Sequence, residues 1–167
     1  MGVISVVFIV TLLIRKKGAV YGAIVSGLTL FFCLFLLDAT LLYRYMLNEP
    51  FSTGYDFSAE FIRITHNNEV ERAQVLFNIA AFVPFGFLLS ESLSSFNRFR
   101  TGRRVVSVTL CSFALSLSIE CLQLFLRLGL FEITDLVMNT VGGLVGACLS
   151  IIGRRLFENK DTRLGRL

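Results

Sequence analysis

The chain has 167 residues, of which 54% are hydrophobic, and its mean hydropathy is +0.72. Soluble domains carry about 25% charged residues, whereas only 17% of this chain is charged and the formal net charge is +4. The charges bunch between long uncharged runs, which excludes an ordinary soluble domain and predicts a polytopic membrane protein.

Five apolar runs follow one another along the chain. A helix needs about 20 residues to cross a bilayer core. The first run is short for a span, and it either crosses with local bilayer thinning or lies partly in the interface. We therefore predict an all-α transmembrane bundle that forms a single membrane domain over residues 1–167, with four full spans and a short N-terminal fifth. The predicted spans cover residues 3–14, 19–42, 74–93, 105–126 and 135–152.

The connections between these runs alternate in charge. Most lysines and arginines lie in three segments, at residues 15–17, 96–104 and 153–167, and most acidic residues lie elsewhere. Cytoplasmic loops carry the excess of Lys and Arg. The pattern thus predicts an N-out, C-in topology, with loop 48–72 outside and with loop 96–104 and the tail 153–167 inside. We interpret the basic segments as topology determinants next to membrane lipids, not as a nucleic-acid site.

No metal or cofactor is predicted. The four cysteines all lie inside apolar runs, where thiols behave as small hydrophobes, and they show no metal-ligand spacing. The single histidine, His66, is too few for a zinc site built from several imidazoles.

Polar residues interrupt the apolar runs at similar depths. At 100° per residue, Ser116, Glu120, Gln123 and Arg127 share one face of the fourth run. On the fifth run, Asp135 and Asn139 form a stripe with two glycines. We expect a polar cluster in the outer half of the membrane. Its predicted members are Asn78, Glu120, Gln123, Asp135 and Asn139, with Asp38, Arg44, Arg127 and Glu132 as secondary members.

Two interpretations of this cluster remain open. An ionisable residue in a span costs about 2.5–3.5 kcal/mol and is a functional candidate by default, which favours a ligand-facing pocket. Alternatively, the polar groups join helices by hydrogen bonds and fix the bundle. Glu120 is either protonated or paired, with Arg127 about two turns away on the same face or with a group on another helix.

Small residues in the third and fifth runs predict close helix packing. The spacing of Gly142 and Gly146 lets another helix approach the fifth run, which would bring Glu120 and Asn139 within reach of each other. Pro84 frees a carbonyl and should kink the third helix, either opening a cleft or fitting its neighbours. The predicted packing residues are Pro84, Gly86, Gly142, Gly143 and Gly146.

Taken together, these residues resemble the VanZ-like family of small bacterial membrane proteins. The resemblance covers roughly residues 48–152. It rests on Asn78 with Pro84-Phe85-Gly86, on Glu120 with Gln123, and on Asp135 and Asn139 with Gly142, Gly143 and Gly146. Family members often read R-x-F-D-x-x-D at the corner before the fifth run. Here the corner reads GLFEITD, with Gly129 at the arginine position and Glu132 in place of the first aspartate, while Arg127 lies two residues earlier.

The resemblance implies a multi-pass protein of the bacterial cytoplasmic membrane. The family is named for a protein associated with low-level resistance to teicoplanin, a glycopeptide with a lipid tail. The favoured expectation is a non-catalytic resistance or envelope factor whose outer-leaflet pocket takes an amphiphile, either a lipoglycopeptide or a lipid-linked wall precursor.

Two other functions stay open. In an intramembrane enzyme acting on a lipid head group, Glu120 and Asp135 would serve as general acid and base. No nucleophile with a partnered base is evident, so catalytic residues are unassigned and the balance is against an enzyme. The third function is a transporter or structural subunit, with oligomers compatible with the small-residue stripe.

Overall fold

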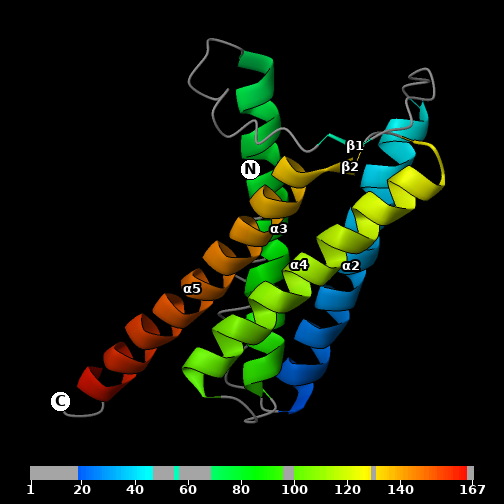
Figure 1. Ribbon diagram of the computed structural model, residues 1–167. Helices are drawn as coiled ribbons and strands as arrows, with labels where there is room; N and C mark the ends of the chain where they lie inside the picture. Colours follow the sequence, from blue (N-terminus) through cyan, green and yellow to red (C-terminus); the bar gives the residue numbers. More distant parts are fainter. Residues whose placement is uncertain (1–18, 47–54, 57–68, 96–99, 129–130, 165–167) are drawn as a thin grey trace.

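A computed structural model describes residues 19–46, 55–56, 69–95, 100–128 and 131–164. The described part of the chain is helical apart from two strands of two residues each (Figure 1). The predicted first span, residues 3–14, lies outside the described residues, as do most of loop 48–72 and residues 96–99 and 165–167. The elements are α2 (Ala19–Met46), β1 (Tyr55–Asp56), α3 (Glu69–Ser95), α4 (Thr101–Phe125), β2 (Phe131–Glu132) and α5 (Ile133–Leu164).

All four helices are long and apolar enough to cross a membrane. Their apolar windows are Val20–Leu41, Val75–Ser94, Thr101–Phe125 and Ile133–Leu156. Large apolar side chains such as Phe31, Phe77 and Phe125 are exposed on the outside of the bundle, which is the surface that lipid would cover. The prediction of an all-helical fold with four helices long and apolar enough to span a membrane is therefore confirmed over the described residues.

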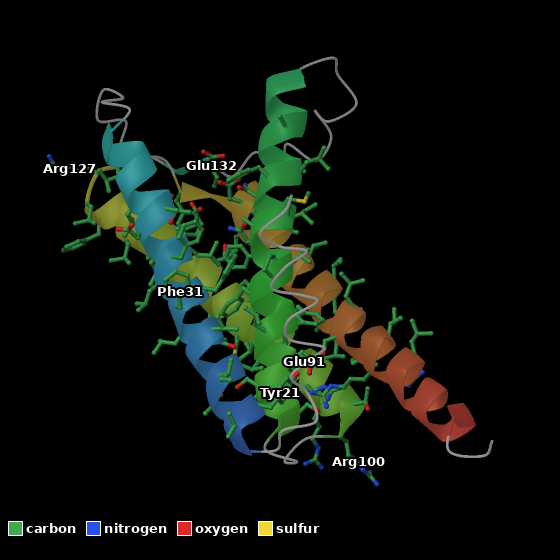
Figure 2. The ribbon with its side chains drawn as sticks, turned by 180° about the vertical axis from the view of Figure 1, so that it is seen from behind. Tyr21, Phe31, Glu91, Arg100, Arg127 and Glu132 are labelled. Carbon is green, nitrogen blue, oxygen red and sulfur yellow. The ribbon has the colours of Figure 1, made fainter. Side chains whose placement is uncertain are left out.

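Successive helices run in opposite directions (Figure 1). One end of the bundle holds the end of α2, the start of α3, the end of α4 and the start of α5; we call it the Asp135 end. The opposite end, where α4 begins, is called the Arg100 end. Arg127 and Glu132 lie at the first end and Arg100 at the second (Figure 2).

Helix α5 lies against α3 with their backbones in direct contact. A Cβ atom added to Gly142 would lie 2.3 Å from the carbonyl oxygen of Ile79, and one added to Gly146 would lie 2.2 Å from that of Val83. On α3, a Cβ at Gly86 would lie 2.1 Å from the carbonyl oxygen of Gly143. Only glycine leaves room for this approach, so the glycines of both helices set the distance between them.

Helix α3 continues as one helix through Pro84. The proline ring has no N–H to donate and frees the carbonyl of the residue four positions earlier, yet the helix ends only at Ser95. Pro84 is buried, between the two positions where α3 meets α5 most closely, Val83 and Gly86.

Apolar packing fills the space between α2, α3 and α4. One group of buried side chains near the Arg100 end contains Tyr21, Val25, Phe87 and Leu88. A second contains Leu36, Phe82, Phe85 and Ile119, in which the two phenylalanine rings meet edge to face with centroids 6.0 Å apart. The polar side chains described below therefore sit in an otherwise apolar interior.

Candidate functional site

One face of α4 carries a row of buried polar residues, which includes Ser112, Ser116, Glu120 and Gln123. Ser116, Glu120 and Gln123 follow one another at helical spacing, and their exposed fractions are 0%, 1% and 3%. Because residues three or four apart lie on the same side of a helix, this stripe faces the interior of the bundle.

The start of α5 and the outer turns of α3 meet this stripe. Asn139 Nδ2 donates a hydrogen bond to Ser116 Oγ at 2.9 Å, which joins α5 to α4. Asn78 Nδ2 donates to Asp135 Oδ1 at 2.6 Å, which joins α3 to α5. The structure thus brings together polar residues from three helices near the Asp135 end, and we call this group the Asp135 cluster. It contains Asn78, Ser116, Glu120, Gln123, Asp135 and Asn139.

The corner between α4 and α5 connects to the cluster through its backbone. The N–H of Glu132 in β2 donates to Glu120 Oε2 at 2.9 Å. Strand β2 in turn pairs in parallel with β1, with Phe131 opposite Tyr55. The buried carboxylate of Glu120 therefore anchors the segment that leads into α5.

Helix α4 ends in a tight reversal at Arg127. The N–H of Leu128 donates to the carbonyl oxygen of Gln123 at 2.8 Å, and that of Arg127 donates to Leu124 at 3.2 Å. Arg127 has φ 57, the left-handed conformation of a residue that follows a helix C-terminus. These features make a Schellman motif, and it turns the chain back toward β2.

The secondary residues predicted for the site behave differently. The expectation that Arg127 continues the buried face of α4 is wrong, because the helix ends at Phe125 and the side chain is exposed beyond it. Asp38 is exposed on α2. Glu132 is half-buried and reaches the cluster through its backbone. The side chain of Arg44 lies outside the part of the chain whose side chains are described.

Gln123 differs from the other members of the Asp135 cluster. Its side-chain oxygen is buried and accepts no hydrogen bond from any of the described residues. Its backbone carbonyl, by contrast, is used by the turn at Leu128. The cluster therefore combines carboxylates, amides and one unsatisfied acceptor, a set suited to hydroxyl or ammonium groups. Over the described ranges, no group of three or more His, Cys, Asp or Glu side chains is placed to hold a metal.

A second polar cluster lies toward the Arg100 end, and sequence reasoning missed it. Arg154 donates to Glu91 twice, from Nε to Oε1 at 2.8 Å and from Nη2 to Oε2 at 2.6 Å. Ser150 Oγ donates to Oε1 at 2.8 Å, and the Tyr21 hydroxyl donates to Oε2. Figure 2 shows Tyr21 and Glu91 facing each other. We call these four residues the Glu91 cluster.

The Glu91 cluster ties α2, α3 and α5 together. Glu91 is 0% exposed, and its two oxygens accept four hydrogen bonds, so its buried charge is fully compensated. The sequence signal was a lone carboxylate inside the third apolar run, close to its end. The sequence pattern groups Arg154 with the basic tail, and nothing in the linear sequence links it to a residue 63 positions earlier.

Comparisons with known proteins identify the family of the chain. The profile of the VanZ/LLP1 family matches residues 4–154. Over 87 residues the chain is 32% identical to a protein named Protein VanZ from Enterococcus faecium; this alignment covers 52% of the chain and 50% of that relative. The chain thus spans about half the length of this relative. No solved structure matches the chain significantly. The family match extends over nearly the whole sequence, and the chain belongs to the VanZ/LLP1 family.

Proposed function

We propose that this chain is a non-catalytic protein of the bacterial cytoplasmic membrane that contributes to protection against teicoplanin-type lipoglycopeptides or to envelope function. Its polar cluster would bind an amphiphile at the outer leaflet, either the lipoglycopeptide or a lipid-linked wall precursor. The observation that carries the proposal is the meeting of buried carboxylate and amide groups from three helices at one end of an apolar bundle.

The chemistry of the cluster suits an amphiphile. Carboxylate and amide oxygens accept hydrogen bonds from sugar hydroxyls or from an ammonium group. The surrounding surface is rich in exposed aromatic and aliphatic side chains, including Phe31 and Phe77, which suit acyl chains. A head group at the Asp135 cluster and a tail along the bundle would therefore each meet matching chemistry.

The charge pattern supports an exterior position for this cluster. Exposed arginines such as Arg100, Arg103 and Arg155 lie at the opposite end, and cytoplasmic ends carry the excess of basic residues. With the Arg100 end inside, the Asp135 cluster faces the leaflet that a glycopeptide or an exported wall precursor reaches first. The family membership supplies the link to glycopeptide resistance.

Conservative substitutions test the proposal. Glu120→Gln and Asp135→Asn each keep an oxygen that can accept the hydrogen bonds from Glu132 and Asn78, but they remove a carboxylate. Each variant is expressed in a teicoplanin-sensitive bacterium, where susceptibility is measured, and is purified to measure its Tm. We expect protection to fall while expression and Tm stay at the wild-type level.

Asp38→Asn is the matched control, because it removes an exposed carboxylate of α2. We expect this variant to protect as well as the wild type. Full protection by Glu120→Gln and Asp135→Asn would contradict the proposal. A parallel loss of protection and Tm would instead assign these carboxylates to helix packing alone.

A further inference from the structure

The environment of the Gln123 side chain inside the bundle is energetically unfavourable. It is 3% exposed, and its Oε1 atom has no hydrogen-bond partner in the part of the chain that the structure describes. Unsatisfied buried acceptors are rare in native proteins and generally call for an explanation. Ser116 and Glu120 lie on the same buried face of α4 as Gln123, so Gln123 projects from the helix face that carries the Asp135 cluster.

The amide donors of the cluster are directed elsewhere. Asn78 donates to Asp135, and Asn139 donates to Ser116. A partner for Gln123 Oε1 must supply a hydrogen-bond donor, such as a hydroxyl or an ammonium. A head group that carries acceptors alone, such as phosphocholine, cannot meet this requirement.

Resting on the function proposed above, we propose that Gln123 determines the specificity of the site by accepting a hydrogen bond from the ligand. The ligand class is an amphiphile whose head group carries hydroxyl or ammonium donors. The other members of the cluster have hydrogen-bond partners among the described residues, whereas Gln123 Oε1 is left for the ligand. Its buried acceptor lowers the stability of the protein without ligand, and ligand binding recovers that loss.

The substitution Gln123→Met separates these two effects. Methionine has nearly the same length and removes the unsatisfied oxygen, so the free protein should keep or raise its Tm. Ligand recognition should be lost. A residue with a purely structural role would behave in the opposite way, since its removal would lower the Tm.

The experiment uses the full chain in nanodiscs of phosphatidylcholine doped with phosphatidylethanolamine or with a glucosyl diacylglycerol. These probes differ in donors: phosphatidylcholine has none, phosphatidylethanolamine has an ammonium and the glycolipid has hydroxyls. Lipids retained by the protein are counted by native mass spectrometry. We expect the wild type to enrich at least one donor-bearing lipid over phosphatidylcholine and Gln123→Met to show no enrichment.

Ser90→Ala is the matched control. The Ser90 hydroxyl is 0% exposed and has no hydrogen-bond partner within the described helices and strands, but it lies beside Glu91, in the other half of the bundle. Its removal should also keep or raise the Tm while leaving lipid enrichment at the wild-type level. A further arm adds teicoplanin to pure phosphatidylcholine nanodiscs, and a Tm rise in the wild type but not in Gln123→Met identifies the drug as the source of the donor.

Three outcomes would overturn the inference: equal behaviour of wild type and Gln123→Met toward all probes, loss of enrichment in Ser90→Ala, or a lower Tm of Gln123→Met in phosphatidylcholine. The susceptibility assay decides the proposed function separately. If Glu120→Gln loses protection while Gln123→Met matches the wild type, the proposed function stands and this inference fails. If the wild type enriches donor lipids but gives no protection, this inference stands and the proposed function fails.

Discussion

The carboxylate of Glu91 accepts hydrogen bonds on both of its oxygens, and the guanidinium of Arg154 supplies two of them. Removing one partner of such a buried pair leaves an uncompensated charge, which costs about 3–5 kcal/mol. We therefore predict that Arg154→Met lowers the free energy of unfolding by about 3 kcal/mol, measured by denaturation of the purified protein in micelles.

Two companion variants make this measurement specific. Arg155→Met removes the neighbouring arginine, whose side chain is exposed, and should leave the unfolding midpoint unchanged. In the double variant Glu91→Met/Arg154→Met no charge is left unpaired, so the loss should be smaller than in Arg154→Met alone. A double variant that loses as much stability as Arg154→Met alone, or more, would contradict the pairing.

At the level of single residues, sequence could predict which polar groups point inward but not which groups they meet. Helical spacing alone placed Ser116, Glu120 and Gln123 on one face. The partner of Asn139 is Ser116, whereas the sequence suggested an approach to Glu120. Residue spacing defines which side chains share a face of one helix. The axial register between two helices depends instead on how their surfaces pack together, and the sequence alone does not give that register.

The packing of α3 against α5 depends on glycine at Gly142. A Cβ atom there would lie 2.3 Å from a carbonyl oxygen of α3, and a backbone atom cannot move aside as a flexible side chain can. Overpacking of this kind costs about 1–3 kcal/mol. We predict that Gly142→Ala lowers the free energy of unfolding by about 2 kcal/mol, measured by thermal and chemical denaturation.

Gly27→Ala provides the control for that prediction. Gly27 lies in α2, and a Cβ atom there would have no heavy atom within 4 Å. Alanine is favoured over glycine inside a helix by about 0.5–1 kcal/mol, so this variant should be slightly more stable than the wild type. If both alanine variants changed stability in the same direction, the close approach of α3 and α5 would not be the cause.

At the level of elements, long apolar runs were sufficient to predict the four helices, because the bilayer requires length and hydropathy above all. The position at which α4 ends was harder to predict from the sequence. Glycine is the usual residue after a helix C-terminus, and the sequence has its glycine at position 129, whereas the left-handed turn occurs at Arg127. An arginine does not indicate the end of a helix. The polar stripe predicted from the sequence therefore extended to Arg127, beyond the last buried residue of the stripe, Gln123.

At the scale of the whole molecule, the sequence predicted that polar groups of separate spans meet at one end. Alternating connections require antiparallel neighbours, and antiparallel neighbours bring the start of α5 beside the end of α4 and the start of α3 (Figure 1). The Glu91 cluster at the other half was not predicted, because Glu91 lay inside an apolar run and Arg154 was grouped with a basic tail. Charge pattern predicts which end of the bundle is cytoplasmic, but it gives no indication of the interior pairing of Glu91 with Arg154.

Sidedness itself is the last prediction, and the proposed function depends on it. With the four cysteines Cys33, Cys111, Cys121 and Cys148 replaced by alanine, Arg127→Cys places one thiol at the exposed turn of the Asp135 end. Gly102→Cys places one at the Arg100 end, where a Cβ meets nothing within 4 Å. A membrane-impermeant maleimide should label Arg127→Cys on intact cells and label Gly102→Cys only after permeabilisation, because basic ends stay inside. The reverse pattern would turn the Asp135 cluster toward the cytosol, where an external glycopeptide does not reach it.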